Sequence, residues 1–386
     1  MSGSSVGSLA GLRVLDLTSN LSGPYCCMML ADHGADVIKI EQPGKGDAAR
    51  AMPPFVAGES APFMIWNRNK RSVVMDLKAE RDRFLALADT ADFVVENFRP
   101  GVLDRLGLGW EVLHARNPRL ILGSISGFGQ TGPRASRGGY DLIAQAMSGL
   151  MSINGPEDGP PFRLPIAISD VTAGMFLAFG LLAALEARHR TGRGQHVETS
   201  LLEAAISLCV YEAAHYFATG TRPPRIGQQH RGSSPYQVFQ TADGWITIGA
   251  SQQAMFEALC RIVGLPALPS DPRFADLALR VRHNHELVAL LQEPLRTMPS
   301  AHWLAALEQA GIPAGPVLHF DEVFEDPHMA AREMVVETEH PVTGRFRTLG
   351  VSVKLSETPG SVCRPAPRLG EHSAELGGPG IPSLQG

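Results

Sequence analysis

The segment LRVLDLTSNLSGPYCCMMLADHGADVIKIE, residues 12–41, sets the fold class. Its first six residues are a short, mostly apolar run, which predicts a buried strand. Gly23-Pro24 begins a helical stretch that continues to His33, and Gly34 ends it. The run VIKIE at 37–41 has the character of a second strand. Strand, helix and strand in this order predict a βαβ unit and therefore a parallel sheet.

Strands and helices continue to alternate along the first half of the chain, and the composition changes after Ala218. Residues 219–234 are rich in Gly, Pro and Arg, which is typical of a linker. The prediction is an α/β protein with a large domain at 1–218, a linker and small α+β domain at 219–318, and a return segment at 319–386 that completes the large domain. We expect further strands at 93–98, 120–126 and 196–200, helices at 170–190 and 201–217, a hairpin of 236–240 with 245–249, and helices at about 252–264, 283–296 and 300–310.

Composition and charge exclude several classes of protein. The 386 residues carry 34 Lys and Arg against 39 Asp and Glu, and 44% are hydrophobic. Such a chain builds a sizeable core and is not disordered. Without a long basic run it is not expected to bind nucleic acid. Five cysteines in no C-x-x-C pattern indicate free thiols in a reducing compartment. No Cys or His cluster has zinc-ligand spacing, so we expect no metal.

The N-terminus and the longest apolar stretch bear on location. Met1 to Leu9 is rich in Ser and Gly and has neither the basic nor the apolar region of a signal peptide. Val171 to Leu185 is uncharged and apolar, but its 15 residues are fewer than the roughly 20 that span a bilayer. We therefore expect a cytoplasmic protein that does not associate with membranes.

A glycine-rich run follows the strand expected at 120–126. GFGQTG at 127–132 matches the G-x-G-x-x-G pattern of dinucleotide sites. However, Pro133 and Gly138-Gly139 stand where a helix should begin, and no strand-ending acid follows about 20 residues later. The dinucleotide fingerprint is therefore not met. The run is better interpreted as a loop at the carboxyl end of a strand, where α/β proteins bind ligands.

Two further patterns each allow two interpretations. NRNKRS at 67–72 is either a solvated turn or a cradle for a polyanion such as phosphate, and spacing alone favours the turn. Asp170 stands directly before the apolar run of its helix. With Ser169 it suits an N-cap, which the residues alone favour. It is also a carboxylate at a helix N-terminus, and Asp serves as a covalent nucleophile towards activated acyl groups.

The ordered set of segments resembles the family III CoA-transferases, the superfamily of formyl-CoA transferase and carnitine CoA-transferase. The resemblance covers nearly the whole chain. Within the family it looks most like the branch of succinyl-CoA:dicarboxylate transferases, which includes the glutarate and hydroxymethylglutarate enzymes. The segments that carry the resemblance are LDLT (15–18), LADHGADVIKIEQPGKGDAAR (30–50), NRNKRS (67–72), VENFRPGVLDRLGLGW (95–110), SISGFGQTGP (124–133), GYD (139–141), SD (169–170), TGRGQ (191–195) and GIPAGP (311–316).

The resemblance implies a fold and a reaction. The fold is a large Rossmann-like domain with a small domain, in an interlocked, ring-like homodimer. The reaction moves CoA from an acyl-CoA, succinyl-CoA by the branch, to a carboxylic acid, here a short dicarboxylate. Asp170 matches the family's nucleophile and would pass through an aspartyl anhydride and an aspartyl-CoA thioester. CoA is a substrate in this reaction, and no permanently bound cofactor is implied.

The resemblance also implies site residues. A dicarboxylate needs a cation for its distal carboxylate, and charge and loop position nominate Arg134, Arg137 or Arg231. Gln42, in place of a basic residue, and a shorter loop at 227–234 depart from formyl-CoA transferase and argue against formate–oxalate exchange. The residues expected to contact CoA are Asn20, Leu21, Ser22, Met75, Lys78, Asn97, Arg105 and Tyr140.

Two alternatives stay open. The α-methylacyl-CoA racemases of the same family carry a His before the Asp of a G-H-D segment, where this chain has Tyr140. A tyrosine, with an ordinary pKa of about 10, is a poor general base near neutral pH, so we favour the transferase. A non-catalytic CoA-binding protein would keep the CoA contacts but would not need Asp170.

Overall fold

The computed structural model describes residues 7–375. Within them the chain forms two compact units. The larger unit comprises the residues up to 150, 163–220 and those from 327 onward. The smaller unit comprises 151–162 and 221–326. From the sequence, 151–162 were expected in the large domain and the small domain was expected to end at 318.

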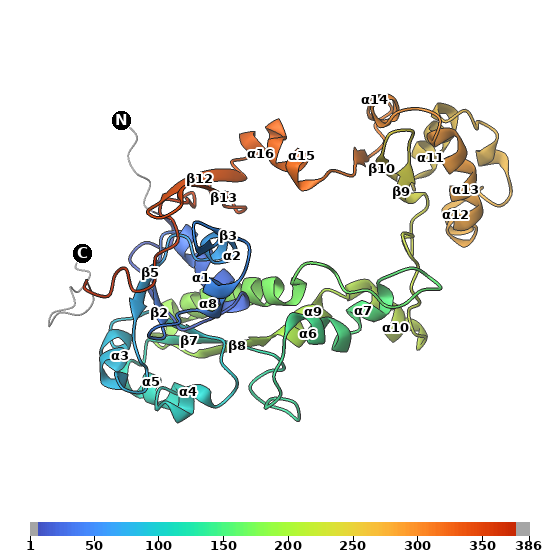
Figure 1. The fold of residues 1–386 in the computed structure, drawn as a ribbon. Helices are drawn as coiled ribbons and strands as arrows, with labels where there is room; N and C mark the ends of the chain where they lie inside the picture. Colours follow the sequence, from blue (N-terminus) through green and yellow to red (C-terminus); the bar gives the residue numbers. More distant parts are fainter. Residues whose placement is uncertain (1–6, 376–386) are drawn as a thin grey trace. The chain divides into compact units, whose positions relative to one another are not determined.

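The larger unit is built on a six-stranded parallel sheet in the order β5-β2-β1-β6-β7-β8 (Figure 1). Counted along the chain, this order is 3-2-1-4-5-6, the order of doubly wound nucleotide-binding sheets. The direction of winding reverses between β1 and β6, so a crevice is expected where these two strands end. The strands are β1 (Arg13–Asp16), β2 (Asp36–Glu41), β5 (Arg71–Val74), β6 (Phe93–Glu96), β7 (Ile121–Ser126) and β8 (His196–Ser200).

Helices cover both faces of this sheet. Val14 belongs to the core cluster that contains residues of α1 (Ser22–Asp32) and α8 (Ile168–Thr191). Its neighbour Leu15 points to the other face, in the cluster with residues of α3, α4 and α5. The strands β1, β6 and β7 are buried throughout, as expected for a parallel sheet between two helical layers.

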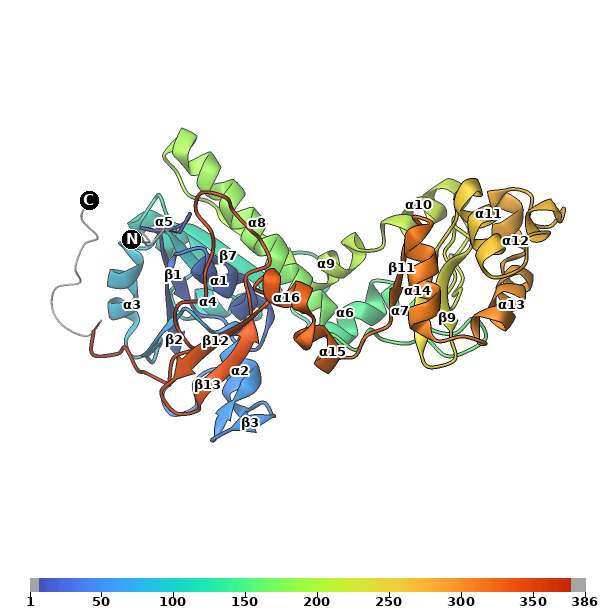
Figure 2. The same cartoon turned by 90° about the horizontal axis from the view of Figure 1, so that it is seen from above.

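The helix α8 runs beside α1 and is long and apolar (Figure 2). Among the helices of residues 7–375, it alone has the length and composition to cross a membrane. From the sequence, its apolar stretch at 171–185 was expected to be too short for this. Half of that span is buried inside the protein, and its buried side packs on α1 and β7. Its buried half is therefore part of the core, while Met175, Phe179 and Leu182 of the same helix are exposed.

The remaining elements of the larger unit surround this core. They include the two-stranded pairs β3 with β4 and β12 with β13. The helix expected at 201–217 is divided into two. The bounds are η1 (Ala48–Ala51), β3 (Phe55–Val56), β4 (Glu59–Ser60), α2 (Ala61–Trp66), α3 (Arg81–Ala88), α4 (Val102–Arg105), α5 (Trp110–Arg116), α6 (Asp141–Met147), α7 (Leu150–Ile153, shared with the smaller unit), α9 (Leu201–Ser207), α10 (Val210–Thr219), α16 (Pro327–Ala331), β12 (Val335–His340) and β13 (Gly344–Leu349).

The smaller unit holds the predicted hairpin within an antiparallel sheet, β11-β10-β9. Helices pack on this sheet around Phe239, Phe256 and Trp303. Its strands are β9 (Tyr236–Gln240), β10 (Trp245–Gly249) and β11 (Ala314–Pro316), and its helices are α11 (Gln253–Ile262), η2 (Leu268–Ser270), α12 (Leu277–Arg282), α13 (Asn284–Leu295), α14 (Ser300–Gln309) and α15 (Phe320–Glu325).

The run at 67–72 contains the expected turn, at 67–69, but it is neither solvated nor open to a phosphate, because its cations pair with carboxylates of this unit. Arg68 and Lys70 are buried and pair with carboxylates of the core at 2.7 Å and 2.9 Å, to Asp32 and Asp16 respectively. The segment then continues directly into β5, a strand that the sequence analysis did not predict. Buried charge pairs of this kind look like a polar turn when only the sequence is read.

Candidate active site

A cavity of about 210 Å³ lies where β1, β6 and β7 end, at the reversal point of the sheet. Asn20 and Ser22 follow β1, and Asn97 follows β6. Ser126 ends β7 on the same wall. Ligands of doubly wound sheets bind at the carboxyl ends of strands, at this reversal point. The cavity therefore occupies the place that the topology reserves for a ligand.

Asp170 lines this cavity as the third residue of α8. The N-cap position is held by Ala167, and no side chain caps the helix. The N-cap interpretation of Asp170 was therefore wrong. A carboxylate in the first turn still benefits from the partial positive charge of the helix N-terminus. The side chain is thus available to face a ligand.

Gly174 brings Asp170 close to the start of α1. It lies one turn after Asp170, on the same side of α8. A Cβ atom at Gly174 would be only 2.6 Å from the Ser22 carbonyl oxygen, so only glycine permits this approach. This places Ser22 beside Asp170, where its hydroxyl lowers the pKa of the carboxylate. The packing of two helices therefore sets the nearest neighbour of Asp170.

The environment of Asp170 raises its pKa from 3.8 to about 7. Burial is the largest cause, and the negative charge of Asp141 adds to it, while the Ser22 hydrogen bond lowers the pKa. Asp141 is held by the Ser169 N–H at 2.9 Å and by the Gln145 amide at 2.8 Å. Near neutral pH Asp170 is therefore close to half ionised and poorly solvated, which suits a nucleophilic carboxylate.

A buried ion pair fixes the loop between β1 and α1. The Asp47 carboxylate accepts the Asn20 N–H at 2.9 Å and the Ser19 hydroxyl at 2.8 Å. Lys39 pairs with the other oxygen of Asp47 at 2.7 Å, and both side chains are fully buried. Asn20 has a φ of 68°, a left-handed conformation that needs such support. The buried Asp47 carboxylate therefore fixes the conformation of the loop beside Asp170.

The glycine-rich loop forms the opposite wall. A Cβ atom at Gly127 would lie 2.6 Å from the Cα of Gly139, so the two glycines let distant parts of the loop touch. Arg137 and Tyr140 of the same loop line the cavity and are exposed, Tyr140 by 74%. The glycines therefore serve close backbone packing beside a ligand cavity.

The structure brings some of the predicted residues together and leaves others apart. Asn20, Ser22, Asn97, Tyr140 and Arg137 line the cavity with Asp170. The others lie elsewhere: Leu21 at the N-cap of α1, Met75 in the core, Lys78, Arg105 and Arg134 exposed outside the lining, and Arg231 in the smaller unit with its guanidinium donating to the Pro224 carbonyl.

Several residues of this site were not among the predicted ones. Phe98, Arg99 and Pro100 line the cavity, and their signal was their place at and directly after the end of the strand predicted at 93–98. Asp141 acts on Asp170 through its charge. Nothing in the sequence spacing indicates that proximity, since it arises from the packing of α6 against α8.

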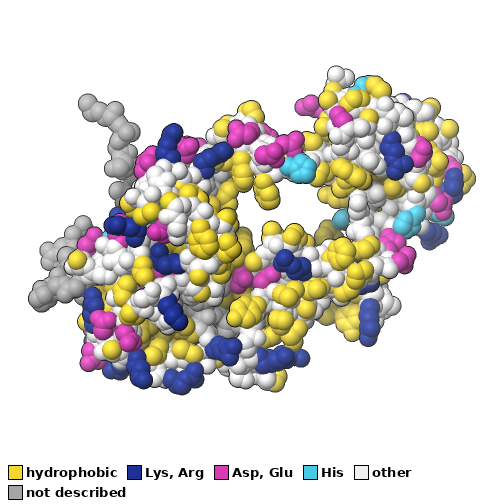
Figure 3. Space-filling model, viewed as in Figure 1, with side chains coloured by type: hydrophobic (Ala, Val, Ile, Leu, Met, Phe, Trp, Pro, Cys, Tyr) yellow, Lys and Arg dark blue, Asp and Glu magenta, His cyan; other side chains and the backbone are white. Residues whose placement is uncertain are grey.

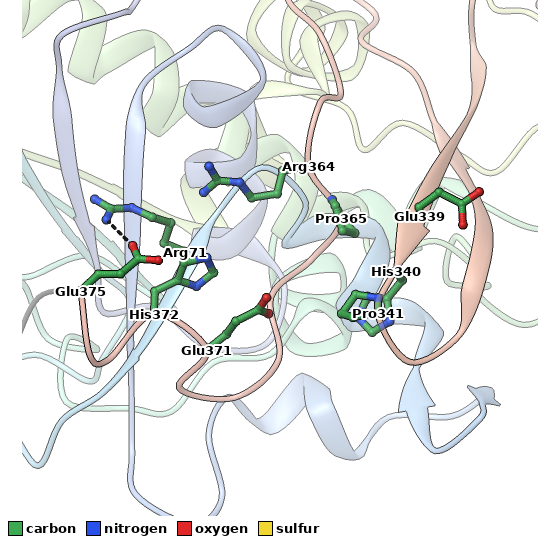
Figure 4. A pocket seen from close by; sticks show the side chains of 9 residues that line it. All are labelled: Arg71, Glu339, His340, Pro341, Arg364, Pro365, Glu371, His372 and Glu375. Carbon is green, nitrogen blue, oxygen red and sulfur yellow. Dashed lines mark hydrogen bonds and ion pairs between the residues drawn. The ribbon is translucent and has the colours of Figure 1, made fainter.

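Two other cavities lie in the larger unit. One, of about 600 Å³, is bordered by β5, the β12–β13 hairpin and the segment 364–375 (Figure 4). There Arg71, from the run at 67–72, pairs with Glu375 at 3.2 Å, and none of the residues nominated for catalysis, CoA or the acceptor lines this cavity. The other, of about 330 Å³, contains Glu96, whose pKa burial raises to about 7. Across residues 7–375, no group of three or more His, Cys, Asp or Glu is placed to hold a metal ion.

Comparison with known proteins gives a consistent picture. Residues 9–373 match the family described as CoA-transferase family III. The chain is 43% identical to an acetyl-CoA:oxalate CoA-transferase of Acetobacter aceti, over 96% of this chain and 95% of that protein. It is 40% identical to a succinyl-CoA:glutarate CoA-transferase of Mus musculus, over 96% and 86%. A solved CAIB/BAIF family protein of Brucella suis has a TM-score of 0.85 at 37% identity, over 96% and 98%.

Proposed function

Because the chain belongs to CoA-transferase family III, we propose that it moves CoA from succinyl-CoA to a short dicarboxylic acid, with Asp170 as the nucleophile. The family makes the chain a transferase that uses CoA thioesters. The donor and the acceptor class rest on the names of relatives, one of which uses succinyl-CoA and glutarate. The observation that carries the proposal is the placement of Asp170 in the cavity at the reversal point of the sheet.

The proposed reaction passes through two kinds of covalent intermediate. Asp170 attacks the thioester carbonyl carbon, the C–S bond breaks, and an anhydride and CoA thiolate result. The thiolate attacks the Asp170 carbonyl carbon and expels the donor acid, which leaves an aspartyl-CoA thioester. The acceptor carboxylate then attacks the aspartyl-CoA thioester, which gives a second anhydride and free CoA thiolate. The thiolate attacks the acceptor carbonyl carbon of this anhydride, which releases the new acyl-CoA and the Asp170 carboxylate. The activated bond is conserved throughout, so the exchange needs no ATP.

The electrostatics of the site suit this chemistry. A carboxylate that is buried and close to a like charge is less stabilised by solvent, which makes it a stronger nucleophile. The N-terminal turn of α8 offsets part of that cost. Asp170 is therefore partly ionised near pH 7. It needs no partner base, because the attack of a carboxylate on the thioester involves no proton transfer.

The acceptor is proposed to be held by Arg137. It is the one member of the three nominated arginines that lines the cavity of Asp170. Its guanidinium suits a distal carboxylate. The departures at Gln42 and 227–234 argued against formate–oxalate exchange, whereas a relative at 43% identity takes oxalate with acetyl-CoA. Oxalate therefore belongs among the acceptors to be tested. The CoA contacts of Lys78 and Arg105 and the cytoplasmic location stay predictions.

We also propose a homodimer, interlocked as the family resemblance implies. The larger unit exposes an apolar stripe on α8, formed by Met175, Phe179 and Leu182, and Phe179 is 72% exposed. Figure 3 shows hydrophobic side chains gathered over the face that carries α6, α8 and α9. Large exposed apolar patches mark interaction surfaces. Light scattering should give twice the chain mass, and Phe179→Glu should shift it towards the monomer; a monomeric wild type would refute the dimer.

The reaction is tested by incubating the purified chain with succinyl-CoA and glutarate, oxalate, malate or citramalate. Mass spectrometry then identifies any new CoA ester. We expect a new ester with at least one dicarboxylate, lost in Asp170→Ala and kept in Asp82→Ala, whose side chain is 94% exposed and distant on α3. An ester that persists in Asp170→Ala would refute the role of Asp170. Deuterium uptake from heavy water into a 2-methylacyl-CoA, without transfer, would favour the racemase.

A further inference from the structure

The hydroxyl of Ser22 occupies a particular place beside Asp170. Ser22 is the first residue of α1, is 5% exposed and lines the cavity of Asp170. Its hydroxyl is close enough to the Asp170 carboxylate to lower the pKa of that group. It is also the one described group that counteracts Asp141, whose charge disfavours the ionised form of Asp170.

Asn97 sets the direction of that hydroxyl. The Asn97 amide nitrogen lies 3.4 Å from the Ser22 oxygen and donates towards it. The same amide is oriented by Ser19, whose N–H it accepts at 2.9 Å and whose carbonyl it donates to at 2.8 Å. Because the Ser22 oxygen accepts from Asn97, its single proton is free to point at Asp170. Asn97, Ser22 and Asp170 line the same cavity, so the Ser22 proton can be directed at the carboxylate.

We propose that Ser22 is a catalytic residue that acts on Asp170 itself: its hydroxyl orients the carboxylate for attack and then donates to the oxyanion formed on the Asp170 carbonyl. The inference rests on the proposed function, in which Asp170 is the nucleophile. It assigns Ser22 a role different from the CoA contact that the family resemblance implies.

The step served by Ser22 is the attack of CoA thiolate on the aspartyl anhydride. A C–S bond forms at the Asp170 carbonyl carbon, and the electron pair of the carbonyl moves to its oxygen. When this pair returns, the C–O bond to the donor acid breaks, and the acid leaves as a carboxylate. Ser22 donates a hydrogen bond to the negative oxygen and transfers no proton. A fixed donor at a developing oxyanion accelerates acyl transfer because the donor needs no rearrangement.

The Ser22→Ala variant tests this inference. We expect kcat to fall roughly 10²-fold, the loss typical of one oxyanion donor, while the Kd for CoA stays unchanged. The acid limb of kcat/KM should move roughly one pH unit higher, since a hydrogen bond to the charged form is lost. The charged and titratable groups around Asp170 are Asp141 on α6, Arg99 after β6, and Arg137 and Tyr140 in the loop after β7, and all are kept in the variant.

Two further variants separate this role from a structural one. Ser22→Cys keeps a weak donor in the same place and should lose less activity than Ser22→Ala. Ser207→Ala removes an exposed hydroxyl on α9 that donates to the Glu203 carbonyl, and should behave as wild type. Equal losses in the alanine and cysteine variants would overturn the inference. So would weaker CoA binding with unchanged kcat, or an unshifted pH profile. A wild type that transfers no CoA would instead refute the proposed function.

Discussion

The substitution Gly174→Ala probes how closely the two helices of the site must approach. Its Cβ would lie 2.6 Å from the Ser22 carbonyl oxygen, whereas ordinary contacts begin at 3.4 Å, so the helices must separate by about 0.8 Å. A displacement of about 1 Å in a catalytic group costs up to 10²-fold in rate. We therefore expect kcat for CoA transfer to fall between about 10- and 100-fold.

The effect on stability should be much smaller than the effect on rate. Overpacking costs about 1–3 kcal/mol, but alanine gains about 1 kcal/mol of helix propensity over glycine. The free energy of unfolding should thus fall by between zero and about 2 kcal/mol, as measured in urea. Gly180→Ala is the matched control. Gly180 lies in the same helix as Gly174 but far from Asp170, and its Cβ would lie 2.7 Å from the Val197 side chain on β8. Equal kcat in wild type and Gly174→Ala would refute the reasoning.

Three other perturbations have defined outcomes. Asp170→Asn should stabilise the fold at pH 8 by about 1–3 kcal/mol. The pKa of Asp170 rises from 3.8 to about 7 on folding, so the wild-type fold loses stability as the pH rises through that interval. Urea unfolding at pH 3.5 should show no difference between the two proteins, and equal stability at pH 8 would contradict the prediction. Arg137→Gln should lower kcat/KM for glutarate about tenfold more than kcat/KM for a monocarboxylate of equal chain length. The control is Arg190→Gln, at the exposed end of α8. An equal loss of kcat/KM for both acids would argue against a contact between Arg137 and the distal carboxylate. Lys70→Met should lower the free energy of unfolding by about 3–5 kcal/mol, because it removes the closest cation from fully buried Asp16, and a loss below about 1 kcal/mol would show that the pair is not needed.

Local patterns were sufficient to predict most of the sheet. The apolar run before Thr18 and the Gly23-Pro24 pair predicted β1 and α1, and both were confirmed. β5 was not predicted because its start, Arg71-Ser72, follows four residues with cations or amides, 67–70, that resemble a turn. The pairing of those cations with distant carboxylates is a tertiary feature, which no local pattern encodes.

The site itself was predictable only in part. Asp170 was identified through the family resemblance, since its local signal was that of a helix cap. Its actual neighbours, Ser22 and Asp141, are brought to it by the packing of α1 and α6 on α8. That packing depends on Gly174, whose role is visible only when the distance to α1 is known. The chemistry of Asp170 therefore follows from contacts between elements that are far apart in the sequence.

Covalent capture of CoA on the protein tests the role of Asp170 most directly. The chain is incubated with succinyl-CoA and no acceptor, its intact mass is measured, and the modified peptide is identified. We predict protein that carries one CoA as a thioester on Asp170, and no modification in Asp170→Ala. CoA attached to another residue, or unmodified wild type that still transfers CoA when glutarate is added, would contradict the mechanism.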